Sequence, residues 1–301
     1  MRRPPTANRA AERATTQGAA VRFAHAKVNL WLNVVGRRSD GYHLLDSLVA
    51  FVDIADTLEA RPSDLLSLEI DGPYANDLAH ESDNLVLKAA RLLADRAGVA
   101  PRAAIRLGKH IPVAAGLGGG SADAAAALRA LSDLWRVALP EEELFDLAAS
   151  LGADVPMCLV GRTALVWGAG ERLKPAPALP PASILLVNPG TPLPTRDVFA
   201  VRRGPFSAPP PPVRPWRDLP ELVAELARRG NDLGEPAMSL RPAIADVLAF
   251  LRASHGARYA AMSGSGATCF ALYNSLDAAR RATASMPPAW WRHAGTFISS
   301  G

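Results

Sequence analysis

Four of the five residues from position 116 to position 120 are glycine, within the segment Pro112-Val-Ala-Ala-Gly-Leu-Gly-Gly-Gly-Ser121. An alternating apolar segment precedes it over residues 103–107, and an alanine-rich helical pattern follows from about Ser121 to Trp135. Glycine lets a backbone adopt positive φ angles and approach a ligand closely. A chain that runs from strand to glycine-rich loop to helix presents unpaired backbone N–H groups at the helix start, which suits a phosphate.

Other glycine-rich motifs do not match this segment. A P-loop requires Gly-Lys-Ser/Thr, and no lysine is present. A dinucleotide fingerprint counted from Gly116 requires glycine or alanine at the position of Ser121. A nucleophile elbow at Ser121 requires glycine at the position of Asp123. The remaining alternative to a phosphate loop is a glycine-rich turn that binds no ligand.

The composition favours a globular protein without affinity for nucleic acid. The chain has 301 residues, which suits two domains, and it is 49% hydrophobic and 21% charged. The net charge of +4 arises within residues 1–22, which hold five arginines and one glutamate. The remaining residues carry 28 basic and 28 acidic side chains. A neutral body does not favour DNA or RNA as a partner.

The location and state of the protein are predicted from weaker signals. Residues 1–20 have no apolar period, so we expect a disordered tail there. No apolar stretch approaches 18 residues, so no membrane partner is expected. Cys158 and Cys269 lie in apolar surroundings and are predicted to be buried free thiols in a reducing compartment. We expect a cytoplasmic protein, either a monomer or a homodimer.

The order of elements predicts an α+β fold in two halves. Strand and helix patterns interleave without the regular βαβ rhythm of a doubly wound sheet. The segment Lys-Pro-Ala-Pro-Ala-Leu-Pro-Pro over residues 174–181 is the best candidate for a crossing between halves. This divides the chain into an N-terminal domain over residues 21–173 and a C-terminal domain over residues 174–301.

Two polar residues stand out on one predicted strand. Over residues 27–34, apolar side chains at even positions alternate with Lys27, Asn29, Trp31 and Asn33. Lys27 and Asn29 are therefore predicted to share one face. A polar turn over residues 36–41 follows, and then Tyr42-His43.

Two further segments hold polar residues near predicted element ends. Asp154 lies in Gly152-Ala-Asp-Val-Pro156, just past a predicted helix that ends at Gly152. On this motif alone, Asp154 is more simply explained as the cap of the next helix. Ser263-Gly-Ser-Gly266 lies between two strand-like segments, and alone it is typical of many tight turns.

Taken in chain order, these motifs resemble the GHMP kinases. The family is characterised by a lysine-containing N-terminal strand, a Pro-x-x-x-Gly-Leu-Gly/Ser-Ser-Ser-Ala loop and a C-terminal loop of small residues. The resemblance covers roughly residues 22–275. It rests on Ala26-Lys-Val-Asn-Leu30, Arg37-Arg-Ser-Asp-Gly-Tyr-His43, Gly116-Leu-Gly-Gly-Gly-Ser121, Gly152-Ala-Asp-Val-Pro156 and Ser263-Gly-Ser-Gly266. The Asp-Gly-Tyr-His stretch resembles a motif of one branch of this family, whose members act on a cytidyl substrate in non-mevalonate isoprenoid synthesis.

The resemblance implies a two-domain GHMP kinase fold with the active site in the cleft between the halves. ATP would be the co-substrate, Mg²⁺ would lie on its phosphates, and the γ-phosphate would pass to the 2-hydroxyl of the cytidyl substrate. Asp154 matches the family's catalytic acid and Lys27 its catalytic lysine. Asn29, Tyr42, His43 and Phe199 match positions that hold the substrate, with Tyr42 and Phe199 expected to sandwich the base and His43 to bind its edge. The implied ATP loop comprises Pro112, Val113, Ala114, Ala115, Gly116, Leu117, Gly118, Gly119, Gly120, Ser121 and Ala122.

Departures from the family pattern leave some roles open. Ala114 and Ala115 replace residues that are commonly glycine, while Ala122 and Asp123 stand where serine and asparagine are frequent. Hydroxyl contacts to phosphate then rest more on Ser121, and no metal ligand is assigned. Two alternatives remain, a GHMP-type kinase for another small alcohol and a non-catalytic nucleotide-binding module. The joint presence of a lysine and an acid at the catalytic positions disfavours the second.

Overall fold

The structure, a computed structural model, describes residues 18–78, 84–208 and 210–298. Residues 1–17 of the expected tail lie outside the described residues. The strands are β1 (Ala20–Arg37), β2 (His43–Arg61), β3 (Ser67–Asp71), β4 (Ala104–Gly108), β5 (Ala164–Gly168), β6 (Arg172–Pro175), β7 (Ser183–Asn188), β8 (Tyr259–Met262), β9 (Cys269–Tyr273) and β10 (Trp291–Thr296). The α-helices are α1 (Leu85–Ala97), α2 (Gly119–Leu134), α3 (Glu141–Leu151), α4 (Val155–Val160), α5 (Thr195–Val201), α6 (Leu219–Arg229), α7 (Gly234–Leu240), α8 (Ala243–Ala253) and α9 (Leu276–Ala282).

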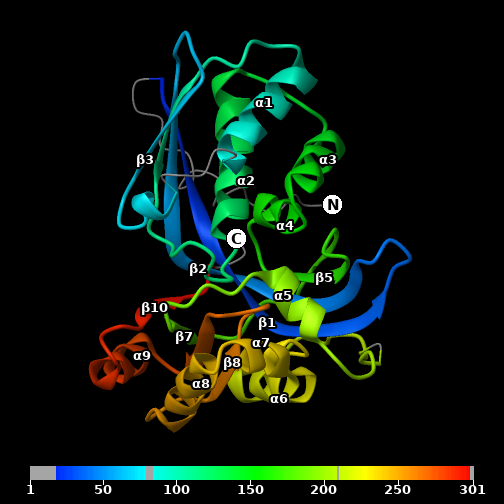
Figure 1. Cartoon of the computed structure of the whole chain (residues 1–301), viewed down its shortest axis with the longest axis vertical. Helices are drawn as coiled ribbons and strands as arrows, with labels where there is room; N and C mark the ends of the chain where they lie inside the picture. Colours follow the sequence, from blue (N-terminus) through cyan, green and yellow to red (C-terminus); the bar gives the residue numbers. More distant parts are fainter. Residues whose placement is uncertain (1–17, 79–83, 209, 299–301) are drawn as a thin grey trace.

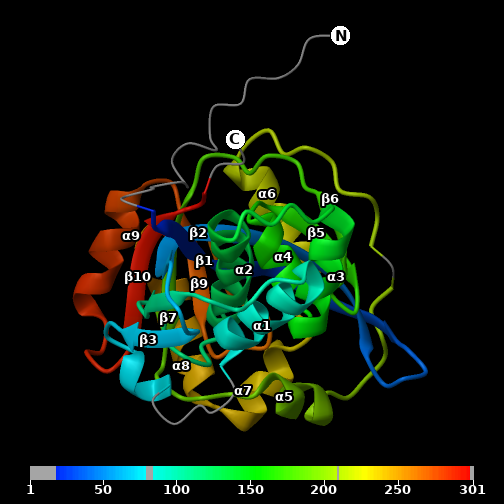
Figure 2. The ribbon, with the colours of Figure 1, turned by 90° about the horizontal axis from the view of Figure 1, so that it is seen from above.

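A long antiparallel hairpin of β1 and β2 runs through both halves of the molecule (Figure 1). The first sheet has the order β3-β4-β2-β5-β6, with β1 also paired to β2. Near its start β2 pairs with β5, and near its end it pairs with β4. Helices α1 to α4 cover one face of this sheet, and α2 packs across both strands of the hairpin (Figure 2). The mixed sheets and helices confirm the predicted α+β class.

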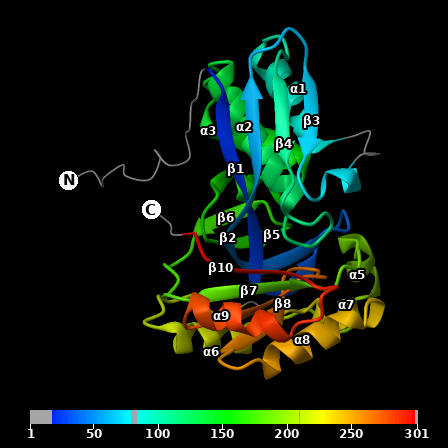
Figure 3. The same ribbon diagram turned by 90° about the vertical axis from the view of Figure 1, so that its left-hand side faces the viewer.

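The second sheet lies on the other side of the hairpin (Figure 3). Its order is β10-β7-β9-β8, and α8 and α9 pack against it. A shared core fills the space between hairpin and second sheet, where Val28, Leu30, Ile184 and Phe270 are at most 1% exposed. The segment 176–182 connects β6 to β7, so the border expected between residues 173 and 174 falls inside β6. Both faces of the hairpin are thus buried in this region.

Local sequence signals place the helix ends. Asn84 accepts a hydrogen bond from the backbone N–H of Val86 at the start of α1, and Gly98 ends that helix at a φ of 63°. Glycine favours this left-handed conformation, and a side-chain oxygen satisfies an N–H group that the helix leaves unpaired. Three glutamates stand in the first turn of α3, where acids interact favourably with the helix dipole.

Strict alternation fails in the middle of β1. The pairing of β1 with β2 has an irregularity between Asn29 and Trp31. Trp31 packs in the same buried cluster as Val28 and Leu30, whereas the sequence pattern placed it on the polar face with Lys27 and Asn29. A bulge changes which face the following side chains occupy, and periodicity alone does not reveal it.

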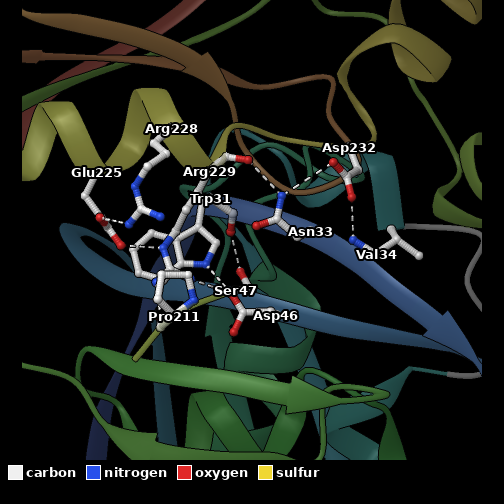
Figure 4. A network of polar contacts seen from close by, with 10 residues as sticks. All are labelled: Trp31, Asn33, Val34, Asp46, Ser47, Pro211, Glu225, Arg228, Arg229 and Asp232. Atoms are coloured by element: carbon white, nitrogen blue, oxygen red, sulfur yellow. Dashed lines mark hydrogen bonds and ion pairs between the residues drawn. The ribbon is translucent and has the colours of Figure 1, made fainter. Parts of the chain in front are cut away.

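A buried arginine ties α6 to the hairpin (Figure 4). The side chain of Arg229 is 2% exposed, and its guanidinium lies 4.3 Å from the ring centre of Trp31. It donates to Asp46 Oδ1 at 3.0 Å, to Glu225 Oε1 at 2.6 Å and to the carbonyl of Pro211 at 2.8 Å. All three guanidinium nitrogens are therefore hydrogen-bonded, and the bond to Asp46 and the contact with Trp31 join α6 to the hairpin.

Replacing Arg229 with Met should destabilise the fold because two carboxylates lose a buried partner. Losing one member of a buried ion pair costs about 3–5 kcal/mol. We expect the lower end, since Asp46 and Glu225 retain 24% and 17% exposure. Urea unfolding measures the free energy. The matched control is Arg228→Met, which removes a partner of the same Glu225 from a side chain that is 52% exposed. Equal losses in the two variants would contradict a special role for the buried arginine.

Candidate active site

Lys27 and Asp154 meet although they lie far apart in the sequence. Lys27 Nζ is 3.2 Å from Asp154 Oδ2 and donates to Asn29 Oδ1 at 2.7 Å. The side chain of Lys27 is 8% exposed, whereas that of Asp154 is 44% exposed. Asn29 is in turn held by Ser47, whose hydroxyl accepts from Asn29 Nδ2 at 2.8 Å. The lysine is thus fixed by neighbours while the acid remains open to a ligand.

Asp154 occupies a helix-cap position without capping the helix. It directly precedes α4 with helical φ and ψ angles of −88° and −12°, and its side chain makes no capping hydrogen bond. Pro156 at the first turn of α4 supplies no N–H group in any case. Asp154 instead lines a cavity, where its carboxylate pairs with Lys27. The geometry therefore does not support the simpler capping interpretation.

The glycine-rich loop lies between β4 and α2, against β1. The N–H of Lys27 donates to the carbonyl of Leu117 at 2.9 Å. Gly118 has a φ of 67°, and a Cβ there would lie 2.7 Å from Lys27 Cγ. Gly116 has a φ of 77°, and a Cβ there would lie 2.2 Å from the carbonyl oxygen of Gly266. Both glycines are therefore required by backbone angle and by close approach.

One departure from the family pattern is visible in the backbone of this loop. Ala114 has a φ of 55°, in the left-handed region that glycine adopts without cost. An alanine in this region costs about 1–2 kcal/mol. The loop nevertheless forms, and neighbouring Ala115 is buried with its carbonyl accepting a hydrogen bond.

The turn from Ser263 to Gly266 docks on both the loop and the hairpin. The N–H of Asn29 donates to Ser263 Oγ at 3.1 Å. Thr268 Oγ1 donates to the carbonyl of Ala115 at 2.5 Å. The turn between β8 and β9 is therefore more than a connection between strands, because it joins the glycine-rich loop to β1.

Asn231 fixes the same turn from the other side. Its side-chain amide donates to the carbonyls of Met262 and Gly264, each at 2.8 Å. Gly264 has a φ of 57°, and a Cβ there would lie 2.9 Å from Asn29 Oδ1. Sequence reasoning missed Asn231, because a single asparagine after a helix is typical of an ordinary turn.

Two adjoining cavities contain almost all of the predicted site residues. The larger has a volume of about 1010 Å³ and is lined by Lys27, Asn29, Tyr42, His43, Asp154 and Phe199, among others. The smaller has a volume of about 260 Å³ and is lined by the whole segment 112–121. Ser121 lines both. Ala122 lines neither, and faces a third cavity beside Arg22. The two cavities therefore meet at Ser121.

Tyr42, His43 and Phe199 line the larger cavity, and two of these rings stack on each other. His43 stacks on Phe199, with ring centres 4.6 Å apart and planes at 21°. Tyr42 is 62% exposed at the same cavity. Burial, with added repulsion from Arg37 and Arg202, lowers the pKa of His43, which favours a neutral ring at pH 7. A neutral imidazole both donates and accepts hydrogen bonds, as binding the edge of a base requires.

A buried charged cluster behind the loop was not predicted. Lys109 Nζ donates to Asp56 Oδ2 at 2.5 Å and to Asp123 Oδ2 at 2.7 Å. All three residues are at most 3% exposed. Asp56 Oδ1 also accepts from the N–H groups of His110 and Ile111. The cluster therefore joins β2 and the start of the loop to the helix at its end, and no local pattern in the sequence reveals three charges this far apart.

The cluster holds one ammonium group for two carboxylates. Burial raises the pKa of Asp123 to about 8, although Lys109 acts in the opposite direction. Asp123 Oδ1 is buried without a hydrogen-bond partner in the described part of the chain. A buried excess of negative charge is costly, and proton uptake at Asp123 removes it.

Replacing Asp123 with Asn should change how stability depends on pH. Folding raises the pKa of Asp123 from its ordinary 3.8 to about 8. At a pH between these two values, the wild-type protein therefore takes up a proton when it folds. Its free energy of unfolding should therefore fall, relative to Asp123→Asn, as pH rises from about 4 to about 8. The slope is at most about 1.4 kcal/mol per pH unit. Urea unfolding of both proteins across this range measures it. A pH-independent difference would show that Asp123 stays ionised beside Lys109.

Other sequence expectations have plain outcomes. Cys158 and Cys269 are free. Cys269 is buried as expected, whereas Cys158 is partly exposed rather than fully buried, and desolvation raises the pKa of both thiols. Within residues 18–78, 84–208 and 210–298, no helix has the length and apolar character needed to cross a bilayer. No cluster of three or more His, Cys, Asp or Glu side chains suited to a metal occurs in those same ranges.

Two family models match the chain. The N-terminal domain of the GHMP kinases matches residues 84–162, and the C-terminal domain of the GHMP kinases matches residues 216–293. The chain is 55% identical to a 4-diphosphocytidyl-2-C-methyl-D-erythritol kinase of Paramagnetospirillum magneticum, covering 89% of this chain and 95% of the relative. It is 51% identical to the enzyme of the same name from Rhodospirillum rubrum, covering 92% of each.

Solved structures agree in fold. A crystal structure of 4-(cytidine 5'-diphospho)-2C-methyl-D-erythritol kinase superposes with a TM-score of 0.74 at 39% identity, covering 93% of this chain and all of that one. A homoserine kinase from Cytophaga hutchinsonii superposes with a TM-score of 0.68 at 20% identity, covering 96% and 98%. At 20% identity, the similarity to the homoserine kinase concerns the fold alone.

Proposed function

Because the chain belongs to the GHMP kinases, we propose that it transfers the γ-phosphate of ATP to the 2-hydroxyl of 4-diphosphocytidyl-2-C-methyl-D-erythritol. Relatives that bear this substrate in their name share 47–55% of their residues with the chain over most of its length. The reaction belongs to the non-mevalonate isoprenoid pathway. A cytoplasmic location and a monomeric or homodimeric state stay predictions.

The Lys27–Asp154 pair carries this proposal. A phosphoryl transfer asks a protein mainly to position the reactants and to stabilise charge. Asp154, half exposed in the larger cavity, accepts the proton of the attacking hydroxyl. Lys27, held by Asn29, stabilises the negative charge on the phosphoryl group as it moves. An ion pair on the open surface, without Asn29 and the cavity around it, would not position a substrate hydroxyl for phosphoryl transfer.

The smaller cavity is proposed to hold the phosphates of ATP. Gly119, Gly120 and Ser121, the first residues of α2, line this cavity, and the unpaired N–H groups of a helix start bind phosphates. Magnesium commonly takes only one or two oxygens from a protein and the rest from phosphates and water. Ser121, whose position lines both cavities, fits this role. Bound there, the ion would neutralise charge on the phosphates.

Two alternatives remain for experiment. A GHMP-type kinase for another small alcohol would share the loop and the Lys27–Asp154 pair, but not the need for a base-binding pocket. The stacked pair of His43 and Phe199 in the same cavity favours the cytidyl substrate over that alternative. A non-catalytic module would bind ATP without passing phosphate to an acceptor.

Incubation of the purified protein with ATP, magnesium and the cytidyl substrate should add one phosphate to the substrate, detected by mass spectrometry.

Asp154→Asn should fold and bind ATP but lose kcat by about a hundredfold or more, since a well-placed general base contributes about 10² to 10⁴ in rate. The matched control is Asp146→Asn, which changes an exposed carboxylate on α3. Near wild-type kcat in Asp154→Asn would remove the proposed base.

Tyr42→Ala tests the proposed pocket for the cytosine ring. Stacking on an aromatic side chain is worth about 1–3 kcal/mol per base, so KM for the cytidyl substrate should rise by roughly 5- to 150-fold. KM for ATP should stay nearly unchanged. Steady-state kinetics measure both, and Phe23→Ala, an exposed aromatic outside the cavity, is the control. A selective rise in KM for ATP would instead assign these aromatics to the adenine ring.

A further inference from the structure

The larger cavity carries an excess of positive charge that its own acids do not balance. Its lining includes five basic side chains, those of Lys27, Arg37, Arg196, Arg202 and Arg203, but only two carboxylates, those of Asp40 and Asp154. Asp154 is paired with Lys27, and Asp40 is paired with Arg38, which is outside the lining. Arg196 lies 3.5 Å from Asp197. The excess is therefore concentrated on the three other arginines.

These three arginines contact backbone carbonyls rather than acids. Arg37 donates to the carbonyl of Gly41 at 3.0 Å. Arg202 donates to the carbonyl of Pro205 at 2.7 Å, and Arg203 donates to that of Ala200 at 2.8 Å. None of the three has an ion-pair partner within the described ranges. The carbonyl contacts hold the side chains in place while leaving their charge uncompensated.

The arginines come from two different segments beside the aromatic pair. Arg37 ends β1 at the hairpin turn, close in sequence to His43, whereas Arg202 and Arg203 follow α5, close to Phe199. Arg37 and Arg202 both act on the titration of His43, which places their charges near that ring. Arg202 Nε is buried and has no acceptor in the described chain. A donor without an acceptor favours a ligand that supplies one.

We propose that Arg37, Arg202 and Arg203 form a subsite for the diphosphate of the alcohol substrate. This inference rests on the proposed function, because it concerns the same acceptor. Planar guanidinium groups bind phosphate oxygens through two parallel hydrogen bonds, and a cleft lined by one sign of charge attracts the opposite sign. An alcohol that lacks an anionic group would gain nothing from these side chains. The subsite therefore selects a nucleoside-diphosphate-linked alcohol over a neutral one.

The phosphates of ATP are the competing occupant, and the position of the arginines disfavours them. The glycine-rich loop lines the smaller cavity, and none of the three arginines is part of that lining. The residues shared by both cavities are limited to Ser121. The arginines thus lie with the aromatic pair on the acceptor side of the site.

The test compares cytidine diphosphate, cytidine monophosphate and cytidine as ligands, using calorimetry and competitive inhibition against the cytidyl substrate. Wild-type protein should bind cytidine diphosphate at least about tenfold more tightly than cytidine, as charge-assisted hydrogen bonds provide. Arg37→Gln and Arg203→Gln should each reduce that ratio roughly 3- to 10-fold, since both side chains are exposed. The affinity for cytidine and KM for ATP should not change. Added salt should weaken the binding of cytidine diphosphate most, that of cytidine monophosphate less, and that of uncharged cytidine least.

Arg280→Gln, which changes an exposed arginine on α9, is the matched control and should leave the ratio unchanged. Arg202→Gln is a further variant, and the two exposed arginines keep the test decisive if it unfolds. Equal wild-type affinities for cytidine diphosphate and cytidine would overturn the subsite. A rise in KM for ATP with an unchanged ratio would also overturn it. Failure of the proposed function appears separately, as absence of phosphate transfer by the wild-type protein, and a ratio that depends on the arginines would still support the subsite.

Discussion

Three glycines allow three distant segments to meet at distances that no side chain permits. At Gly116, Gly118 and Gly264 an added Cβ would lie within 3 Å of Gly266, Lys27 and Asn29, respectively. All three glycines have positive φ angles. The glycine-rich loop is therefore shaped by two constraints at once, the approach of β1 on one side and of the Ser263–Gly266 turn on the other. The position of the lysine relative to the acid depends on this packing.

The buried cluster around Lys109 acts at the other end of the same loop. Charges at this depth carry a large desolvation cost, which is recovered only when each has a partner in good geometry. Asp56 on β2 and Asp123 on α2 both contact the lysine, so a loop with a different path would leave the buried ammonium group without these partners. The cluster thus restricts the loop to one arrangement, at some cost in net stability. A hydrophobic core alone would not impose this restriction.

Features encoded within a short segment could be predicted from the sequence. The loop from Pro112 to Ser121, the caps of α1 and the start of α3 all follow from residues that act on their immediate neighbours. The resemblance to a family supplied the pairing of Lys27 with Asp154, which the structure places 3.2 Å apart. Residues that act across the fold were missed. Lys109, Asp56 and Asp123 come from three segments, and nothing local marks them.

The same limit explains what was not foreseen within correctly predicted elements. Alternation located β1 but misplaced Trp31, because an irregularity in pairing depends on the partner strand. The stacking of His43 on Phe199 was not foreseen, because the direction of a side chain past a turn is set by packing. The expected sandwich of a base between Tyr42 and Phe199 stays a prediction. Periodicity describes a segment by itself, whereas these outcomes depend on what lies against it.

The hairpin of β1 and β2 also constrains the order in which the protein can form during synthesis. Its second face is covered by β7, β9 and α6, and the N–H of Ile298 donates to the carbonyl of Phe51. A chain growing from its N-terminus therefore displays this apolar surface until β9, which ends at Tyr273, has left the ribosome. Domains whose cores are complete fold as they emerge, but here the N-terminal half lacks part of its covering. A nascent chain of this protein must keep that surface from other chains until β7, α6 and β9 have been made.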